Sequence, residues 1–191
     1  MILTKPYKSA NRGDVSQVFM NKSNAYASGY HDGTDWCSSY GTFLVAPEDV
    51  LIERLYYGEF LDQSTEGLRR GHGLVMKSLE TPNVYHLYWH CLPIFPVKVG
   101  DVVNRGKVVG QMGNTGYVMR GGVVVPLELR NIPPYQGTHL HQGGYEMVNG
   151  EKVFFDTLAV TDFSLPVNYD VITTMKSILQ NMSNVLKGQK K

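Results

Sequence analysis

The sequence lacks an excess of either charge, because 18 Lys and Arg residues stand against 17 Asp and Glu residues. A near-neutral chain gives no support for binding nucleic acid through a basic face. No apolar run approaches the roughly 18 residues needed to cross a membrane, so we expect no membrane span. The first eight residues contain no apolar core, and we therefore expect no encoded signal peptide.

Cysteine is also scarce. Cys37 and Cys91 are too few for a disulfide-rich secreted scaffold, and we expect two free thiols, although one bridge between them stays open. Hydrophobic residues make up 42% of the chain and charged residues 18%, which excludes intrinsic disorder. A chain of 191 residues can bury a sufficient core without covalent cross-links.

Glycine, proline and tyrosine are plentiful, with 20, 9 and 12 residues respectively, as is typical of a turn-rich β protein. Short runs rich in Val, Tyr and Ile, broken by turn residues, predict strands. These runs are 42–46, 50–55, 74–77, 84–90, 96–99, 102–103, 107–111 and 123–129. No stretch between residues 40 and 160 keeps a helical period for long. We therefore predict a mainly antiparallel β domain over residues 1–160.

The tail has a different pattern, which predicts an amphipathic helix over residues 169–187 within a helical extension of residues 161–191. Apolar residues recur there at i, i+3, i+4 and i+7 spacing, and Gly188 follows as a stop signal. We expect this helix to pack on its own domain. Self-association through residues 169–187, or contact with another protein, is the alternative.

Two stretches, residues 58–71 and 118–138, are predicted to be long loops, which in a compact domain are either functional or surface excursions. The glycine-rich segment 97–116 places Asn114 and Gly116 where the chain must turn sharply. We interpret this segment as scaffold with no chemistry of its own.

Histidine and aspartate form two groups with the spacing of metal ligands. In the first, His31 and Asp35 lie four residues apart across Gly33. In the second, His139 and His141 project from one face of a strand, because side chains alternate along a strand. Two imidazoles and a carboxylate can hold Zn²⁺ with a fourth position open for water, which is a common hydrolytic arrangement.

Five motifs follow one another along the chain. They are His31-Asp-Gly-Thr-Asp35, Gly41-Thr-Phe-Leu-Val-Ala-Pro47, Tyr88-Trp-His90-Cys-Leu92, the glycine-rich segment 97–116 and His139-Leu-His141. In this order they resemble the motifs of the lysostaphin-like (LytM-type) zinc endopeptidases, which cut peptide bonds in bacterial peptidoglycan. The resemblance covers roughly residues 14–148. It implies a mainly β peptidase domain with the barrel-sandwich-like, duplicated-hybrid-motif fold.

The resemblance also implies roles for individual residues. His31, Asp35 and His141 would hold the Zn²⁺ ion, and His90 and His139 would be the catalytic pair. One ring would accept a proton from water and the other would bond the developing oxyanion; which ring does which is open. Tyr135 and His86 are weaker candidates for the substrate cleft, and His86 has a structural role as its alternative.

The chain departs from the family in one place, because residues 117–138 stand where the family has only a few residues between Gly116 and His139. We expect this insertion to form one wall of the substrate cleft. The metal positions themselves are unaffected by it.

The function predicted from these residues is zinc-dependent hydrolysis of a peptide bond in the stem peptide or cross-bridge of peptidoglycan. A bacteriophage source fits, either as an endolysin released by a holin or as a virion component that acts on the cell wall beside other phage structural proteins. The main alternative is a catalytically silent structural or wall-binding module. A sugar-transport phosphocarrier is a further alternative, but it would not need Asp35 or the pair His139 and His141.

Overall fold

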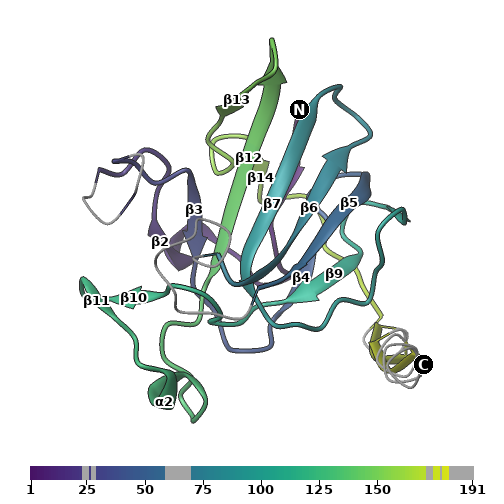
Figure 1. Ribbon diagram of the computed structural model, residues 1–191. Helices are drawn as coiled ribbons and strands as arrows, with labels where there is room; N and C mark the ends of the chain where they lie inside the picture. The colour runs from purple at the N-terminus through teal and green to yellow at the C-terminus, as the bar shows by residue number, and fades with distance from the viewer. Residues whose placement is uncertain (23–25, 27–28, 59–69, 171–173, 177, 181–191) are drawn as a thin grey trace, which may run out of the picture.

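The computed structural model describes residues 1–191 except 23–25, 27–28, 59–69, 171–173, 177 and 181–191. An eight-stranded antiparallel sheet dominates the described residues (Figure 1). Its order is β2 (Val15–Gln17), β3 (Gly33–Trp36), β12 (Leu140–Val148), β7 (Val84–Cys91), β6 (His72–Ser78), β5 (Val50–Tyr57) and β8 (Val102–Val103), with β13 (Glu151–Phe154) paired to β12. The prediction of a mainly antiparallel β protein is confirmed.

Three smaller strand pairs complete the β-structure of the described residues. They are β4 (Phe43–Val45) with β9 (Val108–Gln111), β10 (Met119–Arg120) with β11 (Val123–Val124), and β1 (Leu3–Thr4) in parallel with β14 (Thr161–Asp162). Two short helical turns, η1 (Arg12–Asp14) and α2 (Leu127–Arg130), accompany them. Because β14 pairs with the N-terminal strand, the segment just after residue 160 is tied to the β domain.

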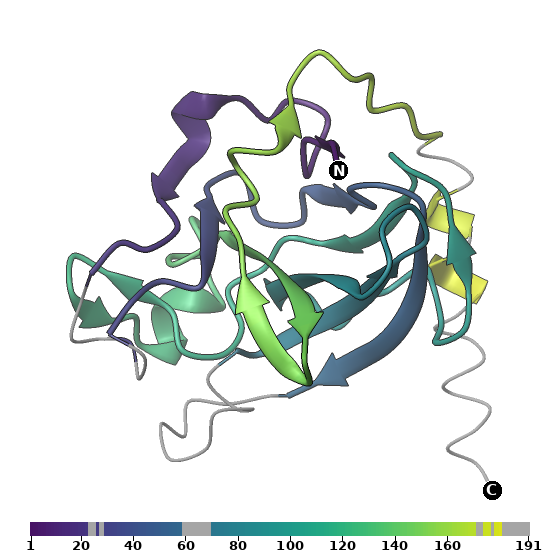
Figure 2. The ribbon, with the colours of Figure 1, turned by 90° about the horizontal axis from the view of Figure 1, so that it is seen from above.

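The main core lies between the large sheet and the β4–β9 pair, which lies above the sheet in the view of Figure 2. Alternation along the strands turns Trp36, Leu74, Tyr88 and Leu140 toward this side, where all four are fully buried. Leu44 from β4 packs into the same cluster. Both cysteines are free thiols, as expected, with Cys91 in this core and Cys37 exposed.

The opposite face of the sheet, called here the open face, carries a different set of side chains. The residues next to the core positions point this way, so Asp35, Trp89 and His141 share this face with Tyr145. Val75 and Leu87 form a small apolar cluster there with the aromatic rings. The open face therefore combines metal-ligand residues with aromatic ones.

Several sequence-based boundaries need correction. Residues 96–99 were predicted to be a strand but form none, because the prolines at 93 and 96 remove backbone donors and Asp101 closes a turn on the Lys98 amide. Residues 127–129 belong to α2 and not to a strand. The predicted loop 118–138 contains the β10–β11 hairpin and α2. The predicted loop 58–71 lies almost wholly outside the described residues.

The predicted tail helix falls partly outside the described residues. Residues 174–176 and 178–180 are helical, with Ile178 buried and Leu179 61% exposed. Ahead of the helix, Tyr169 packs edge-on against Phe43 of β4. A membrane-spanning helix, which would need to be both long and strongly apolar, is not found among the described residues.

Candidate metal centre and catalytic histidines

Three buried side chains converge where β3 lies beside the start of β12. His141 is paired with Asp35 across the two strands, and His31 lies just before β3. His31 Nε2 is 3.0 Å from Asp35 Oδ1 and 3.0 Å from His141 Nδ1, and His141 Nδ1 is 3.1 Å from the same carboxylate oxygen. We call these three residues the metal cluster. They are the set of described side chains that could hold a metal ion.

Gly33, in the middle of the first motif, allows this close approach. A Cβ atom at this position would lie 2.7 Å from His141 Nε2 and 2.6 Å from the Gln142 carbonyl oxygen. Real Cβ atoms do not come so near to their neighbours, so any other residue would push the His141 ring away from Asp35. The glycine between His31 and Asp35 is therefore a packing requirement of the metal cluster.

The far nitrogen of each ligand histidine is also held. His31 Nδ1 bonds the carbonyl oxygen of Val18 at 3.1 Å, and His141 Nε2 bonds Asp32 Oδ1 at 3.2 Å. Partners of this kind fix the ring orientation of metal-binding histidines. The sequence analysis missed Asp32, although its position beside His31 in the first motif was a usable signal. Asp32 is in turn paired with Arg70, which has a guanidinium nitrogen 3.7 Å from Asp32 Oδ2.

The carboxylates and His141 shift one another's protonation. Burial opposes charge on Asp35, but hydrogen bonds from His141 and His31 outweigh it and lower the pKa of Asp35 well below its usual value. Burial likewise disfavours charge on His141, yet bonds to Asp32 and Asp35 raise its pKa to about 9. Burial also raises the pKa of Asp32, but the hydrogen bond from His141 outweighs this effect, and the pKa of Asp32 falls to about 2. The cluster thus gathers negative charge around the imidazoles, which also suits a bound cation.

The donor set fits a zinc ion. Two imidazole nitrogens and one carboxylate oxygen lie 3.0–3.1 Å apart, and tetrahedral zinc with bonds of about 2.0–2.1 Å holds its ligands only slightly farther from one another. Three protein ligands leave one position for water or substrate, as in catalytic zinc sites. The same residues would suit other divalent metals that prefer imidazole.

His90 and His139 lie beside the metal cluster and outside it. Their ring centroids are 4.5 Å apart, and the His90 ring is 6.2 Å from that of His141. His139 Nε2 is 3.8 Å from Asp35 Oδ2. Burial and the neighbouring His139 and His141 lower the pKa of His90 well below its usual value, so this ring is neutral near pH 7. The structure thus brings all five predicted site residues together.

The backbone at His90 departs from a regular strand. Alternation predicts that His90 lies on the same face as His86 and opposite to Trp89. Instead, φ is 62° at His90, and the pairing of β6 with β7 shifts register between His72 and Leu74. This bulge turns the His90 ring toward His141, on the same side as Trp89. Bulges that redirect a side chain are common next to active sites.

The glycine-rich segment does more than form a scaffold, which corrects the interpretation made from the sequence. The Thr115 carbonyl oxygen bonds His90 Nδ1 at 2.8 Å. The Thr115 hydroxyl donates to the Cys91 carbonyl and accepts from the His72 amide, which ties the turn to both strands around His90. The Asn-Thr-Gly turn is therefore part of the support of His90.

The other two candidates do not belong to the metal cluster. His86 is fully buried on the core side of β7, where it pairs with the equally buried Glu48. Tyr135 belongs to the insertion and stacks on Tyr40, with ring centroids 4.2 Å apart. Tyr40 follows β3 along the chain, so this contact joins the insertion to the loop beyond Asp35.

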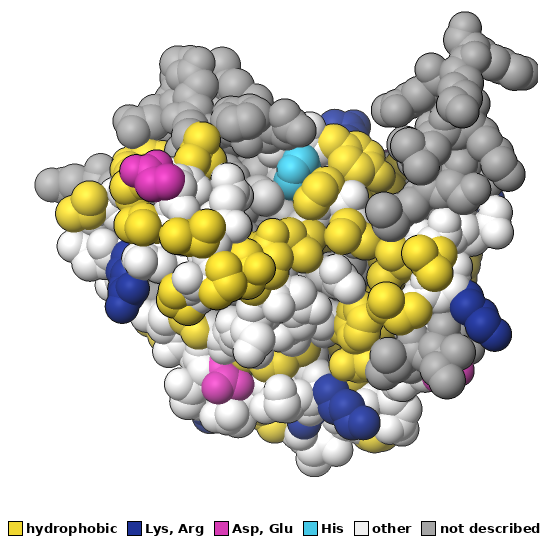
Figure 3. Space-filling view, turned by 90° about the horizontal axis from the view of Figure 1, so that it is seen from below, with side chains coloured by type: hydrophobic (Ala, Val, Ile, Leu, Met, Phe, Trp, Pro, Cys, Tyr) yellow, Lys and Arg dark blue, Asp and Glu magenta, His cyan; other side chains and the backbone are white. Residues whose placement is uncertain are grey.

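The insertion, residues 117–138, is anchored by reciprocal hydrogen bonds. The Asn114 side chain donates to the carbonyl oxygens of Arg130 and Gln136, while the buried Arg130 guanidinium donates to those of Asn114, Gly116 and Val125. Figure 1 shows β10, β11 and α2 below the start of β12, at the same end of the sheet as the metal cluster. From below, hydrophobic side chains form a band across this end, and one histidine is visible beside it (Figure 3).

Comparison with known structures supports the same fold. The catalytic domain of lysostaphin from Staphylococcus simulans aligns over 76% of this chain and 89% of its own, with 19% identity and a TM-score of 0.55. A zinc-containing peptidase from Vibrio cholerae aligns over 87% of this chain but only 41% of its own, with 20% identity and a TM-score of 0.56. LytU aligns over 78% of this chain and 86% of its own, with 21% identity and a TM-score of 0.54.

Curated protein sequences gave no match to this chain. The sequence profile of Peptidase family M23, in contrast, matches residues 29–150, which is well over half of the chain and includes the metal cluster, His90 and His139. The motifs, the fold and the arrangement of the five site residues agree with this match, and the chain therefore belongs to Peptidase family M23.

Proposed function

We propose that the protein is a zinc-dependent endopeptidase that hydrolyses peptide bonds in bacterial peptidoglycan. The observation that carries the proposal is the placement of two non-ligand histidines, His90 and His139, beside a buried set of three metal-ligand side chains. Membership of a peptidase family and the fold shared with lysostaphin support the choice of reaction.

The hydrogen bonds of the two histidines suit proton transfer. Carbonyl oxygens only accept hydrogen bonds, so Nδ1 of His90 and Nδ1 of His139 both carry protons, toward Thr115 and Gly137 respectively. A ring held in this way has its Nε2 lone pair available whenever the ring is neutral. One ring can accept a proton from the attacking water, and the other, once protonated, can donate to the oxyanion that develops on the scissile carbonyl.

Zinc held by His31, Asp35 and His141 would polarise the scissile carbonyl and lower the pKa of a water molecule to near 7. Asp32 and the Val18 carbonyl would keep the two ligand rings in place. Thr115 would do the same for His90. The insertion, anchored through Asn114 beside this centre, would form one wall of the substrate cleft with Tyr135.

Digestion of purified cell walls tests the proposal. Zinc-loaded protein should release peptide fragments with new amino termini, which mass spectrometry identifies together with the bond that is cut. The variant His90→Ala, still loaded with zinc, is the matched control and should release almost none. Zinc-loaded protein that sediments with walls and releases no new amino termini would instead indicate a silent wall-binding module.

A further inference from the structure

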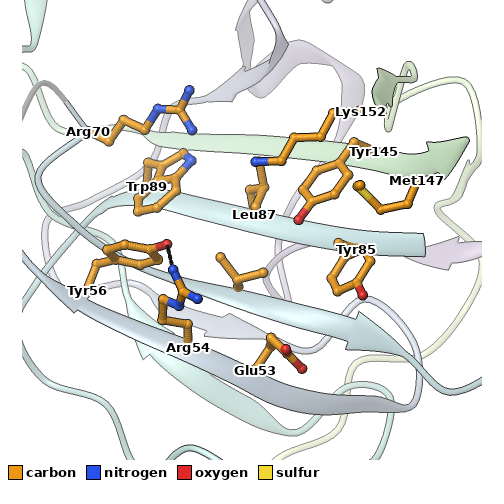
Figure 4. Close-up of a pocket in the computed structure, with 11 residues that line it drawn as sticks. Glu53, Arg54, Tyr56, Arg70, Tyr85, Leu87, Trp89, Tyr145, Met147 and Lys152 are labelled. Carbon is orange, nitrogen blue, oxygen red and sulfur yellow. Dashed lines mark hydrogen bonds between the residues drawn. The ribbon is translucent and has the colours of Figure 1, made fainter. Parts of the chain in front are cut away.

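The open face of the sheet contains a hollow whose lining residues are distinct from the metal cluster. It has a volume of about 340 Å³, within the range of small-molecule sites. Its floor comes from β5, β6, β7 and β12, and Lys152 reaches over it from β13 (Figure 4). We call it the aromatic pocket, because Tyr56, Tyr85, Trp89 and Tyr145 line it.

The aromatic rings of this pocket pack against one another and so form a preorganised floor. Tyr85 and Tyr145 stack with centroids 5.0 Å apart, and Tyr56 meets Trp89 edge to face at 5.0 Å. Gly73 lies beneath Trp89, and a Cβ there would come 2.2 Å from the indole. Such a floor suits the methyl and methylene groups of a bound chain.

The rim of the pocket is positively charged. Arg54, Arg70 and Lys152 line it against a single carboxylate, Glu53. The Lys152 ammonium lies 4.7 Å from the centroid of Tyr145, and Arg54 donates to the Tyr56 hydroxyl at 3.1 Å. Within the described part of the chain, neither Arg54 nor Lys152 has a carboxylate oxygen within 4.0 Å. Both cations are therefore placed to meet a carboxylate from outside.

The pocket adjoins the metal cluster on the same face of the sheet. Trp89 is paired with His141 across β7 and β12, and Arg70 spans the two sites, over the Trp89 ring at 5.4 Å and 3.7 Å from Asp32. Tyr145 is four residues beyond His141 on β12, which corresponds to about 13 Å along the sheet. An extended peptide covers that distance in about four residues.

We propose that the aromatic pocket binds the carboxylate of an acidic peptide three or four residues from the bond cut at the metal centre. This inference rests on the proposed function and refines it. A glycine cross-bridge has no side chains to cover the aromatic floor and no carboxylate along its length. A stem peptide with a free glutamate carboxylate has both, so the pocket favours the stem peptide as the substrate.

Binding to the intact chain can be measured without cleavage. The chain has two tryptophans, of which Trp36 is fully buried, so a ligand-dependent change in fluorescence reports on Trp89. The probes are the tetrapeptide L-Ala–γ-D-Glu–L-Lys–D-Ala, the same peptide with its glutamate carboxylate amidated, and tetraglycine. The acidic tetrapeptide should bind about tenfold more tightly than its amidated form, the gain expected from a charge-assisted hydrogen bond.

The double variant Arg54→Gln/Lys152→Gln should lose this preference. Lys98→Gln/Lys107→Gln removes the same charge from exposed positions outside the pocket and should keep it. Equal affinity for the acidic and amidated peptides, or a preference that survives the pocket variant, would overturn the inference. Because no bond is cut in this assay, a failure of wall digestion contradicts the proposed function and leaves the result on the pocket intact.

Discussion

His90 Nδ1 donates a hydrogen bond to the carbonyl oxygen of Thr115 over 2.8 Å. This bond selects one tautomer, since a carbonyl can only accept, and so leaves Nε2 of the neutral His90 ring unprotonated, in a ring that neighbours His139 and His141. Thr115 belongs to a turn that its glycines suggest is purely structural. Its backbone nonetheless determines which nitrogen of a catalytic candidate can take up a proton.

The first prediction concerns this pair of histidines. His90→Ala and His139→Ala should keep zinc, because neither side chain belongs to the metal cluster. Each should lower turnover on cell walls about 10²–10⁴-fold, the usual contribution of a positioned acid–base group. Metal analysis and fragment release measure the two quantities on the same preparation. A variant that cuts walls at the parent rate would remove that histidine from the mechanism.

The second prediction concerns the ligands. His31→Ala, Asp35→Ala and His141→Ala should each lower zinc content below one ion per chain, since two remaining ligands define a site poorly. His90→Ala is the matched control, because it removes a neighbouring imidazole that is not a ligand. Full zinc content in all three ligand variants would show that the metal is held elsewhere.

The third prediction tests the outer support of the metal cluster. Asp32→Asn leaves the three ligands in place but weakens the hold on His141 Nε2. Loss of such a partner typically costs 10–100-fold in metal affinity, so competition with a chelator of known zinc affinity should reveal a weaker site. Glu151→Gln, at an exposed carboxylate paired with Val148 at the far end of β12 from His141, serves as the control. Unchanged zinc affinity in Asp32→Asn would contradict the assigned role.

The fourth prediction concerns stability and uses the buried pair of Glu48 and His86. Although burial opposes it, the bond to His86 lowers the pKa of Glu48 below its ordinary value of 4.5. The ionised carboxylate therefore stabilises the fold above about pH 4.5, and this contribution is lost as the pH falls through the folded-state pKa. In thermal unfolding experiments, the melting temperature of the parent protein should therefore fall more steeply below pH 4.5 than that of Glu48→Gln.

At neutral pH, Glu48→Gln should lower the free energy of unfolding by about 1–3 kcal/mol, because it weakens a hydrogen bond to a charged group with no access to water. Glu80→Gln breaks a partly exposed ion pair with Arg105 and should cost less than about 1 kcal/mol. If both substitutions lowered the free energy of unfolding by the same amount, burial would not strengthen the contribution of the Glu48–His86 pair to stability.

The fifth prediction concerns the insertion as a wall of the cleft. Replacing residues 118–136 with a short Gly-Ser linker should keep zinc bound and change KM, turnover or the choice of bond. Tyr135→Ala probes the same wall with less disruption, since it removes the stack on Tyr40 and leaves the Arg130 anchor in place. If both zinc-loaded variants cut the same bond at the parent rate, the insertion packs away from the substrate.

Local patterns were sufficient to predict the fold class and the two ligand motifs. Alternation over residues 139–141, at the start of β12, places His139 and His141 on one side, and Gly33 marks the first motif. The hydrogen bonds that hold these side chains in place could not be predicted from the sequence, because they join segments that are distant in the chain. Val18 and Thr115 act through backbone carbonyls, which any residue type supplies, so no side-chain pattern could reveal them.

Two further differences have a similar cause. Periodicity treats β7 as regular, whereas a bulge at His90 changes the side on which its ring lies. The aromatic pocket draws on residues from five strands, spread between Glu53 and Lys152, and a second bulge lets Glu53 and Arg54 both line it. The pocket forms only when these strands pair, so the local sequence pattern of any one strand could not predict it.

The bulge at His90 also constrains how the sequence of this protein can change. Trp89 in the floor of the aromatic pocket and His90 beside the metal cluster are consecutive in the chain, and one backbone distortion lets His90 face the same side of the sheet as Trp89. An insertion or deletion in this part of β7 would displace both residues at once. Side chains on β5 and β13 can in contrast be exchanged without a shift of the backbone at His90.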